Sequence, residues 1–467
     1  MILAAMVATF ALASWLLKSP ELSMVITAVV GALVGGLGFP VRLLVEGTFT
    51  YFDVAFTFLT ASIFINFYSA TGAMDALVRG MVDRFYDSKW VLFFLLAVIM
   101  LIPGALTGAG SVSMFVVGGM VATVLRFMGI RDARIVAFVY VTSMLAAVAP
   151  PINLWVMLMC AQANMPYVGF DVPLLAPIVL ITVFTVFYLL RGGSPQPKAD
   201  ILASLPEAPR GTNAFRIATP LVVFVVLLVL SKYAAFFMPI LGIPLIFLIS
   251  TLVAMILSPR RLGPAGWYRV LTDTSEQVFP LLATVISVGV LVNIMTSTGV
   301  RGLIAINFVT LPVYLIYTFA LIVLPLAQGS LSYSSGIILG TPLIFLFNSV
   351  GVNVTIVATA LSLIFPLGDC LPPSRISGRV AIDVSGYKGS YMSFLRAILV
   401  PALFMGLVAL GSQVPDDILQ ALARVGTPEA QNQLQNMADI QTVIPRTACL
   451  QLQVTGLQAE LEESRGQ

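Results

Sequence analysis

The stretch LIFPLGDCLPPSRISGR, residues 363–379, follows a long apolar run and contains three prolines, one aspartate and two arginines. Proline removes a backbone N–H and breaks a helix interior. An ionisable side chain at membrane depth costs several kcal/mol unless it is compensated, so it usually has a function. The stretch therefore predicts a membrane helix that is broken where a functional site lies.

The composition places the chain in a membrane. Of its 467 residues 59% are hydrophobic and 10% are charged, whereas soluble domains are about 25% charged. The chain has no histidine, and its three cysteines form no CxxC pair. We therefore expect no enzyme activity, no cofactor and no transition-metal site. No run of basic residues predicts nucleic-acid binding.

Two pairs of apolar segments, near 89–128 and 311–348, are joined by uncharged linkers, IPGALTGAGSVS and LPLAQGSLSYSS. Uncharged turns of small residues suit the tips of re-entrant hairpins buried in protein. With both hairpins re-entrant the chain has ten spans, and most basic residues gather on one side. By the positive-inside rule that side is cytoplasmic and both termini lie outside.

The two halves of the chain repeat each other. Pro150-Pro151 in MLAAVAPPINLW and Pro372-Pro373 are 372 − 150 = 222 positions apart, and the same offset relates Gly118 to Gly340. Five spans separate equivalent elements, and this odd number inverts the second copy. Inverted repeats with interrupted helices are typical of secondary transporters.

We therefore expect an all-α polytopic membrane protein with two inverted repeats, about ten spans, two re-entrant hairpins and broken helices. The expected divisions are a first membrane repeat (1–190), a cytoplasmic linker (191–215), a second repeat (216–410) and a polar C-terminal tail (411–467).

Each half offers a hairpin tip and a helix break whose freed carbonyls need a partner. Carbonyl and hydroxyl oxygens there predict one Na+ site per half, although neighbouring helices could satisfy the breaks instead. The candidate cation ligands are Thr107, Gly108, Ser111, Ala149 and Pro150 in the first half, and Gly329, Ser330, Ser332, Gly368 and Asp369 in the second.

The candidate substrate-binding residues are Asn153, Ser374 and Arg375. A guanidinium forks onto a carboxylate, which favours an organic acid as substrate. Three alternatives stay open: Asp369 carries a proton, Asp369 and Arg375 neutralise each other, or Asn153 caps the second part of its helix.

The order of these elements resembles the large permease subunit of tripartite ATP-independent periplasmic (TRAP) transporters, in the ion transporter superfamily. Gly104, Thr107, Gly108 and Gly110 match the hairpin pattern of that family, and APPINL resembles its Pro-Pro segment. The resemblance implies elevator-type, Na+-driven import of an organic acid, such as a C4-dicarboxylate or sugar acid, across a bacterial inner membrane. It also implies two partners, a small membrane subunit and a periplasmic substrate-binding protein.

Two segments depart from that family. SVSMFVV lacks the acidic residue that usually follows the first tip, and LPPSRISGR replaces a segment that usually reads like TPPVGLNLF. The first alternative is a stand-alone Na+- or H+-coupled carboxylate symporter of the same superfamily. A channel or an intramembrane enzyme is disfavoured by the lack of a charged pore ring and of a catalytic pattern.

Overall fold

The computed structural model describes residues 1–207, 213–233, 241–258, 262–309, 313–349, 352–371 and 375–413. Regular structure in these ranges is helical throughout. Residues 1–413 cluster as one unit, and the prediction of a polar tail falls almost wholly outside the described residues.

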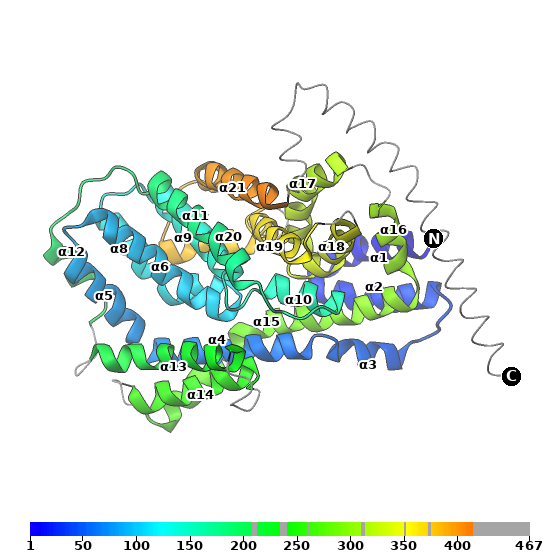
Figure 1. Ribbon diagram of the computed structural model, residues 1–467, viewed down its shortest axis with the longest axis horizontal. Helices are drawn as coiled ribbons and strands as arrows, with labels where there is room; N and C mark the ends of the chain where they lie inside the picture. Colours follow the sequence, from blue (N-terminus) through cyan, green and yellow to red (C-terminus); the bar gives the residue numbers. More distant parts are fainter. Residues whose placement is uncertain are drawn as a thin grey trace, which may run out of the picture. The chain divides into compact units, whose positions relative to one another are not determined.

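The first half begins with four helices and continues through a hairpin and a broken helix (Figure 1). Its elements are α1 (Ile2–Leu17), α2 (Pro20–Val34), α3 (Val41–Phe49), α4 (Phe52–Ala70), α5 (Ala73–Phe85), α6 (Lys89–Thr107), α7 (Gly110–Ser113), the π-helical turn η1 (Met114–Gly118), α8 (Gly119–Phe127), α9 (Asp132–Val148), α10 (Leu154–Ala163) and α11 (Asp171–Leu189).

A short helix, α12 (Lys198–Ser204), leads to the second half. That half comprises α13 (Ala214–Tyr233), α14 (Ile243–Leu257), α15 (Pro264–Ser297), α16 (Val300–Val309), α17 (Val313–Leu331), the π-helical turn η2 (Gly336–Gly340), α18 (Thr341–Ser349), α19 (Val354–Ile364), the 3-10 turn η3 (Phe365–Gly368), α20 (Ile376–Ser385) and α21 (Tyr391–Gln413).

The apolar helices confirm an all-α polytopic membrane protein. Six described helices are long and apolar enough to cross a membrane: Phe52–Ala70, Lys89–Thr107, Gly110–Phe127, Asp171–Leu189, Pro264–Ser297 and Tyr391–Gly411. Shorter apolar helices of 10–17 residues accompany them. The number of crossings and the inverted orientation of the repeats stay predictions.

The helix boundaries repeat with the offset found in the sequence. η1 begins at Met114 and η2 at Gly336, and 336 − 114 = 222. α8 and α18, α9 and α19, and α10 and α20 begin with the same offset. The repeated order of hairpin, helix, break and helix is therefore present in the fold.

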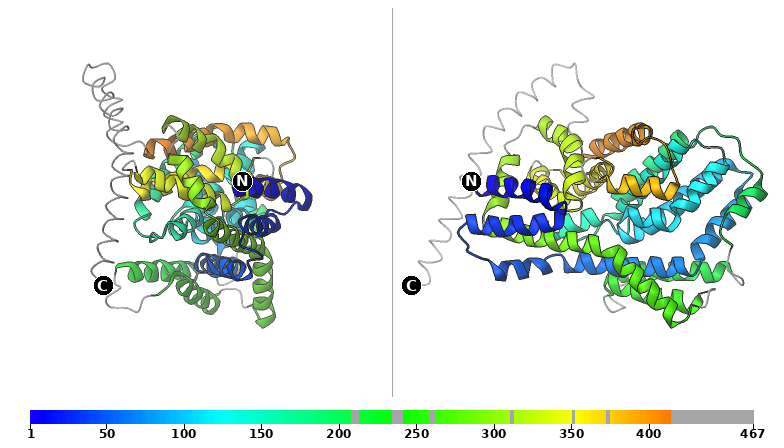
Figure 2. Two further views of the ribbon diagram at one scale, coloured as in Figure 1. Left: turned by 90° about the vertical axis from the view of Figure 1, so that its right-hand side faces the viewer. Right: turned by 180° about the vertical axis from the view of Figure 1, so that it is seen from behind.

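The helices form two groups. A framework group consists of α1–α4 and α13–α15, where α15 contacts α2, α3 and α4, and α14 contacts α4. A hairpin group consists of α6–α11 and α17–α21, in which α9 contacts α6, α11 and α21. Figure 1 shows α4, α13 and α14 below the hairpin group, and Figure 2 shows α1, α2 and α15 side by side.

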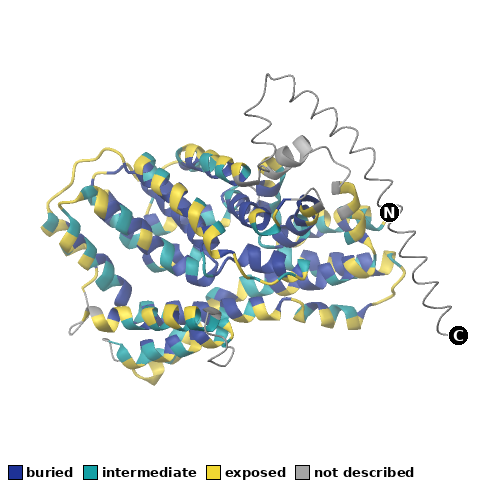
Figure 3. Ribbon diagram, viewed as in Figure 1, coloured by how far each residue is buried: buried dark blue, intermediate teal, exposed yellow. Residues whose placement is uncertain are grey.

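The centre of the hairpin group is buried on all sides (Figure 3). Every residue from Ile135 to Val148 of α9 is buried, as is every residue from Val357 to Ile364 of α19. Helices that are apolar all round belong in the interior of a large protein. The breaks that follow α9 and α19 therefore begin in the protein core.

The linker between the halves packs on the first half, which the sequence did not predict. Arg79 donates to the carbonyl of Leu202 at 2.9 Å, and Ile201 is buried. Lys198 pairs with Asp83 at 2.8 Å, and its hydrogen bond lowers the pKa of the Asp83 carboxyl. The Asp83 carboxyl therefore stays charged at neutral pH, and the ion pair holds α12 against α5.

We predict that Arg79→Ala loosens this linker, because it removes the donor to the α12 backbone. Trypsin should cleave after Lys198 several-fold faster than in the unmodified protein, as measured by gel densitometry. Arg84→Ala, at an exposed position of the same helix, is the control. Equal cleavage rates in the two variants would contradict this account of the linker.

Candidate functional site

The first hairpin tip lies against the first helix break, as predicted. The backbone N–H of Ile152, within the break, donates to the carbonyl of Ala105 near the tip at 3.2 Å. Gly108 has φ +72°, and a Cβ there would lie 3.1 Å from the nitrogen of Leu154. Only glycine satisfies both the left-handed backbone and this close approach without strain.

Hydroxyl groups complete the first tip. Thr107 is fully buried, donates to the carbonyl of Pro103 at 2.8 Å and accepts from the N–H of Ala109 at 3.3 Å. Ser143, on α9, is fully buried, and its hydroxyl has no hydrogen-bond partner among the described residues. The backbone carbonyl oxygen of Ser143 would lie 2.6 Å from a Cβ added at Gly110 in the tip. Ser143 therefore lies next to the tip, and its hydroxyl group is unpaired among the described residues.

Of the other first-half candidates, Ala149 is buried, whereas Ser111 and Pro150 are half-buried. Pro150 and Pro151 are joined by a cis peptide bond. These residues lie at the tip or the break as expected, and their role as cation ligands stays a prediction.

Asn153 caps the second part of the broken helix. Its Oδ1 accepts from the N–H of Val156 at 3.1 Å. Its Nδ2 donates to the carbonyl of Val148 at 3.0 Å and to the hydroxyl of Ser362 in the second half at 2.9 Å. The capping alternative is thus confirmed, while contact of Asn153 with a substrate stays a prediction.

Tyr167 satisfies further backbone groups of the same break. Its hydroxyl donates to the carbonyl of Pro151 at 3.1 Å and accepts from the N–H of Asn153 at 3.1 Å. An unpaired backbone group in hydrocarbon costs several kcal/mol. The first break is therefore held largely by neutral protein groups.

The second tip meets the second break in the same way. A Cβ at Gly368 would collide with the carbonyl oxygen of Pro325 in α17, so glycine permits this close packing. Ser332, with φ +53°, turns the chain at the tip, and its N–H donates to the carbonyl of Gln328 at 2.8 Å. Gly329 is buried, and the Ser330 hydroxyl donates to the carbonyl of Leu326 at 3.3 Å.

Asp369 lies at this junction and accepts two hydrogen bonds. Gln328 Nε2 donates to its Oδ1 at 2.8 Å, and Ser377 Oγ donates to its Oδ2 at 3.4 Å. Arg375 has its guanidinium 5.3 Å from the centre of the Tyr391 ring.

No ion pair between described side chains joins Asp369 to Arg375. The structure therefore does not show this pair, and mutual neutralisation stays a prediction. Ser374, the remaining candidate, lies outside the described residues with Pro372 and Pro373.

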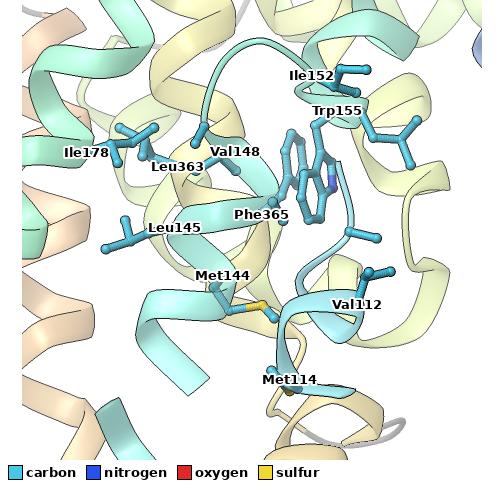
Figure 4. Packing of buried hydrophobic residues seen from close by; sticks show 14 of the residues in the cluster. Val112, Met114, Met144, Leu145, Val148, Ile152, Trp155, Ile178, Leu363 and Phe365 are labelled. Carbon is cyan, nitrogen blue, oxygen red and sulfur yellow. The ribbon is translucent and has the colours of Figure 1, made fainter. Parts of the chain in front are cut away.

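The sequence analysis missed the polar residues that join the two halves. Trp155 Nε1, at the start of α10, donates to Gln328 Oε1 at 3.2 Å, and the Ser335 hydroxyl donates to the same oxygen. Figure 4 shows the Trp155 indole beside Phe365 in the packed core. One signal was available, because Gln328 is an isolated polar residue directly before the Gly329 tip.

An apolar cavity of about 550 Å³ borders the second break, between η3, α9, α17 and α21. Tyr140, Pro325, Pro366 and Cys370 line it, and none of the described residues that line it is charged. A carboxylate would therefore find no charged partner among them.

The comparisons with known proteins concern the fold. No protein-family model matches the chain, and no curated protein matches its sequence. The YdaH transporter of Alcanivorax borkumensis has a similar structure, with a TM-score of 0.59 and 14% identity over 81% of this chain and 88% of that chain.

MtrF of Neisseria gonorrhoeae, described with a class of antimetabolite efflux pumps, has a TM-score of 0.58 and 13% identity over 80% of this chain and 83% of that chain. The chain therefore has the fold of membrane transporters. Neither structure is described as a TRAP subunit, so the resemblance to TRAP permeases stays a proposal.

We predict that Gly108→Ala destabilises the protein, since a non-glycine residue in the left-handed region costs about 1–2 kcal/mol and the new Cβ crowds Leu154. Its thermal midpoint, followed by the fluorescence of a thiol-reactive dye, should fall by several degrees. Gly80→Ala is the control, because Gly80 lies within α5 with nothing within 4 Å of an added Cβ. A Gly108→Ala midpoint no lower than that of Gly80→Ala would contradict the described tip.

Proposed function

We propose that the chain is an ion-gradient-driven secondary transporter of the bacterial inner membrane that moves an organic acid. The observation that carries this proposal is the second junction, where a hairpin tip, a broken helix and the carboxylate of Asp369 meet without an ion pair to Arg375. The fold shared with two membrane transporters supports the proposal.

The coupling ion in this proposal is Na+, which is bound at both junctions. Unwound carbonyls and hydroxyls coordinate such ions in broken transporter helices. In the first half Thr107, Gly108, Ser111, Ala149 and Pro150 supply them, and the unpaired hydroxyl of Ser143 is a further ligand. In the second half Gly329, Ser330, Ser332 and Gly368 supply neutral oxygens and Asp369 supplies the negative charge.

The substrate in this proposal is an organic acid such as a C4-dicarboxylate or a sugar acid. Arg375 carries the positive charge that a carboxylate needs, and its half-buried guanidinium lies over Tyr391. Planar guanidinium and carboxylate groups pair through two parallel hydrogen bonds. Arg375 would therefore hold the substrate beside the second cation site.

Alternating access would follow from movement of the hairpin group against the framework group, in elevator fashion. One polar contact between them is centred on Gln162, at the end of α10. With its amide oriented to satisfy both neighbours, Gln162 donates to the Tyr51 hydroxyl at 2.5 Å and accepts from Arg301. These bonds would break and re-form in each cycle.

Two assemblies fit this proposal. As a TRAP permease, the chain would work with a small membrane subunit and a periplasmic substrate-binding protein, importing the acid. As a stand-alone symporter, it would need neither partner.

We predict that Asp369→Asn weakens the Na+ dependence of transport, because the charged cation ligand is lost. Proteoliposomes would be tested for uptake of labelled dicarboxylates and sugar acids with and without a Na+ gradient. The Na+ concentration for half-maximal uptake should rise at least tenfold. Asp53→Asn, at an exposed position at the start of α4, is the control and should match the unmodified protein.

Uptake by the unmodified protein at the same rate in the absence of a Na+ gradient would contradict Na+ coupling. Unchanged Na+ activation in Asp369→Asn would instead assign Asp369 to a structural role.

Affinity purification of the chain from its native membrane tests the assembly. A TRAP permease should retain a small membrane subunit in mild detergent at a constant ratio, and its uptake should require a soluble binding protein. Transport by the purified chain alone would exclude the TRAP assembly and support the stand-alone symporter.

A further inference from the structure

Gln328 joins elements that lie far apart in the chain. It is 1% exposed and lies near the end of α17, directly before the second tip. Its side chain bonds to Asp369 of the second break, to Ser335 of the second hairpin and to Trp155 of the first repeat.

The indole of Trp155 fixes which way the Gln328 amide faces. An indole N–H only donates, so the atom of Gln328 that faces it has to be the amide oxygen. The amide nitrogen then faces Asp369 Oδ1, at 2.8 Å. A flipped amide would set two donors against each other and leave the carboxylate without this bond.

This orientation prepares Asp369 to bind a cation. Oδ1 is held by a neutral donor, and the more distant Ser377 hydroxyl is the partner of Oδ2. The carboxylate is thus kept in one position as an acceptor, and no cation among the described residues forms an ion pair with it. A buried carboxylate that lacks such a donor is less stable in its charged form.

The same bonds tie the second junction to the first. Trp155 lies in the first turn of α10, two residues after its cap Asn153. The centre of the Trp155 ring lies 4.5 Å from the centre of the Tyr333 ring at the second tip. A shift of Asp369 toward a bound ion therefore pulls on the Gln328 amide and, through it, on the indole of α10.

We propose that Gln328 is a positioning residue that holds Asp369 ready for the coupling cation and transmits cation binding to Trp155 in the first repeat. This inference rests on the proposed Na+-coupled function.

The test measures the fluorescence emission of Trp155 itself. The chain has four tryptophans, and a parent with Trp15, Trp90 and Trp267 replaced by phenylalanine retains only Trp155. The purified full-length parent is titrated with NaCl against choline chloride at constant ionic strength, with no substrate added. We expect a saturable change in Trp155 emission.

Gln328→Met in this parent removes the amide and nearly keeps its volume. We expect the Na+ concentration for half the emission change to rise about tenfold, which corresponds to ~1.4 kcal/mol. Asn66→Leu is the control, because it removes a half-buried amide that bonds to Thr274 and Gln277 within the framework group. It should titrate like the parent.

The outcomes separate the inference from the proposed function. If uptake is Na+-dependent but Trp155 does not respond, or Gln328→Met titrates like the parent, the inference is overturned and the proposed function stands. If neither the Trp155 emission nor the uptake responds to Na+, both the inference and the proposed function are contradicted.

A second variant covers the case in which Gln328→Met does not fold. Trp155→Phe, in the otherwise unmodified chain, removes the indole N–H that orients the amide and retains an aromatic ring. Na+-dependent uptake should then need several-fold more Na+ for half-maximal rate. An unchanged requirement would overturn the inference.

Discussion

A membrane helix that breaks leaves backbone N–H and carbonyl groups that only protein atoms or a bound ion can satisfy. This constraint explains why each break in the chain faces a hairpin tip. In the first half, Ile152 bonds to Ala105 and Tyr167 bonds to Pro151. In the second half, Gly368 packs on the carbonyl of Pro325. Each broken helix therefore needs a hairpin tip beside it, because the tip packs against the break and supplies partners for its backbone groups.

The two junctions share a backbone plan and differ in their side chains. Asn153 and Tyr167 satisfy the first break with neutral groups, whereas the second contains Asp369, held by Gln328, and Arg375 over Tyr391. The helix breaks are therefore common to both halves, whereas the charged residues at the break occur only in the second half. The repeated plan sets the architecture, and the unshared charges of the second half are what the proposed coupling and substrate recognition depend on.

The repeat and the meeting of tips with breaks could be predicted from the sequence, because prolines, glycines and an offset of 222 positions encode them locally. The polar partners could not, since Trp155 and Gln328 are 173 positions apart and Asn153 and Ser362 are 209 apart. The packed linker was missed for the same reason, because Arg79 and Leu202 are 123 positions apart. The absence of an Asp369–Arg375 pair depended on side-chain directions that spacing does not specify.

The central claim is that the junctions of tip and break bind the coupling ion, and direct binding of radioactive ²²Na+ to the purified chain tests it without knowledge of the substrate. A scintillation proximity assay would titrate the protein with ²²Na+ and compete it with unlabelled Na+ and K+. The account predicts saturable binding that unlabelled Na+ displaces and K+ does not. Binding that is absent, or that K+ displaces equally well, would contradict it.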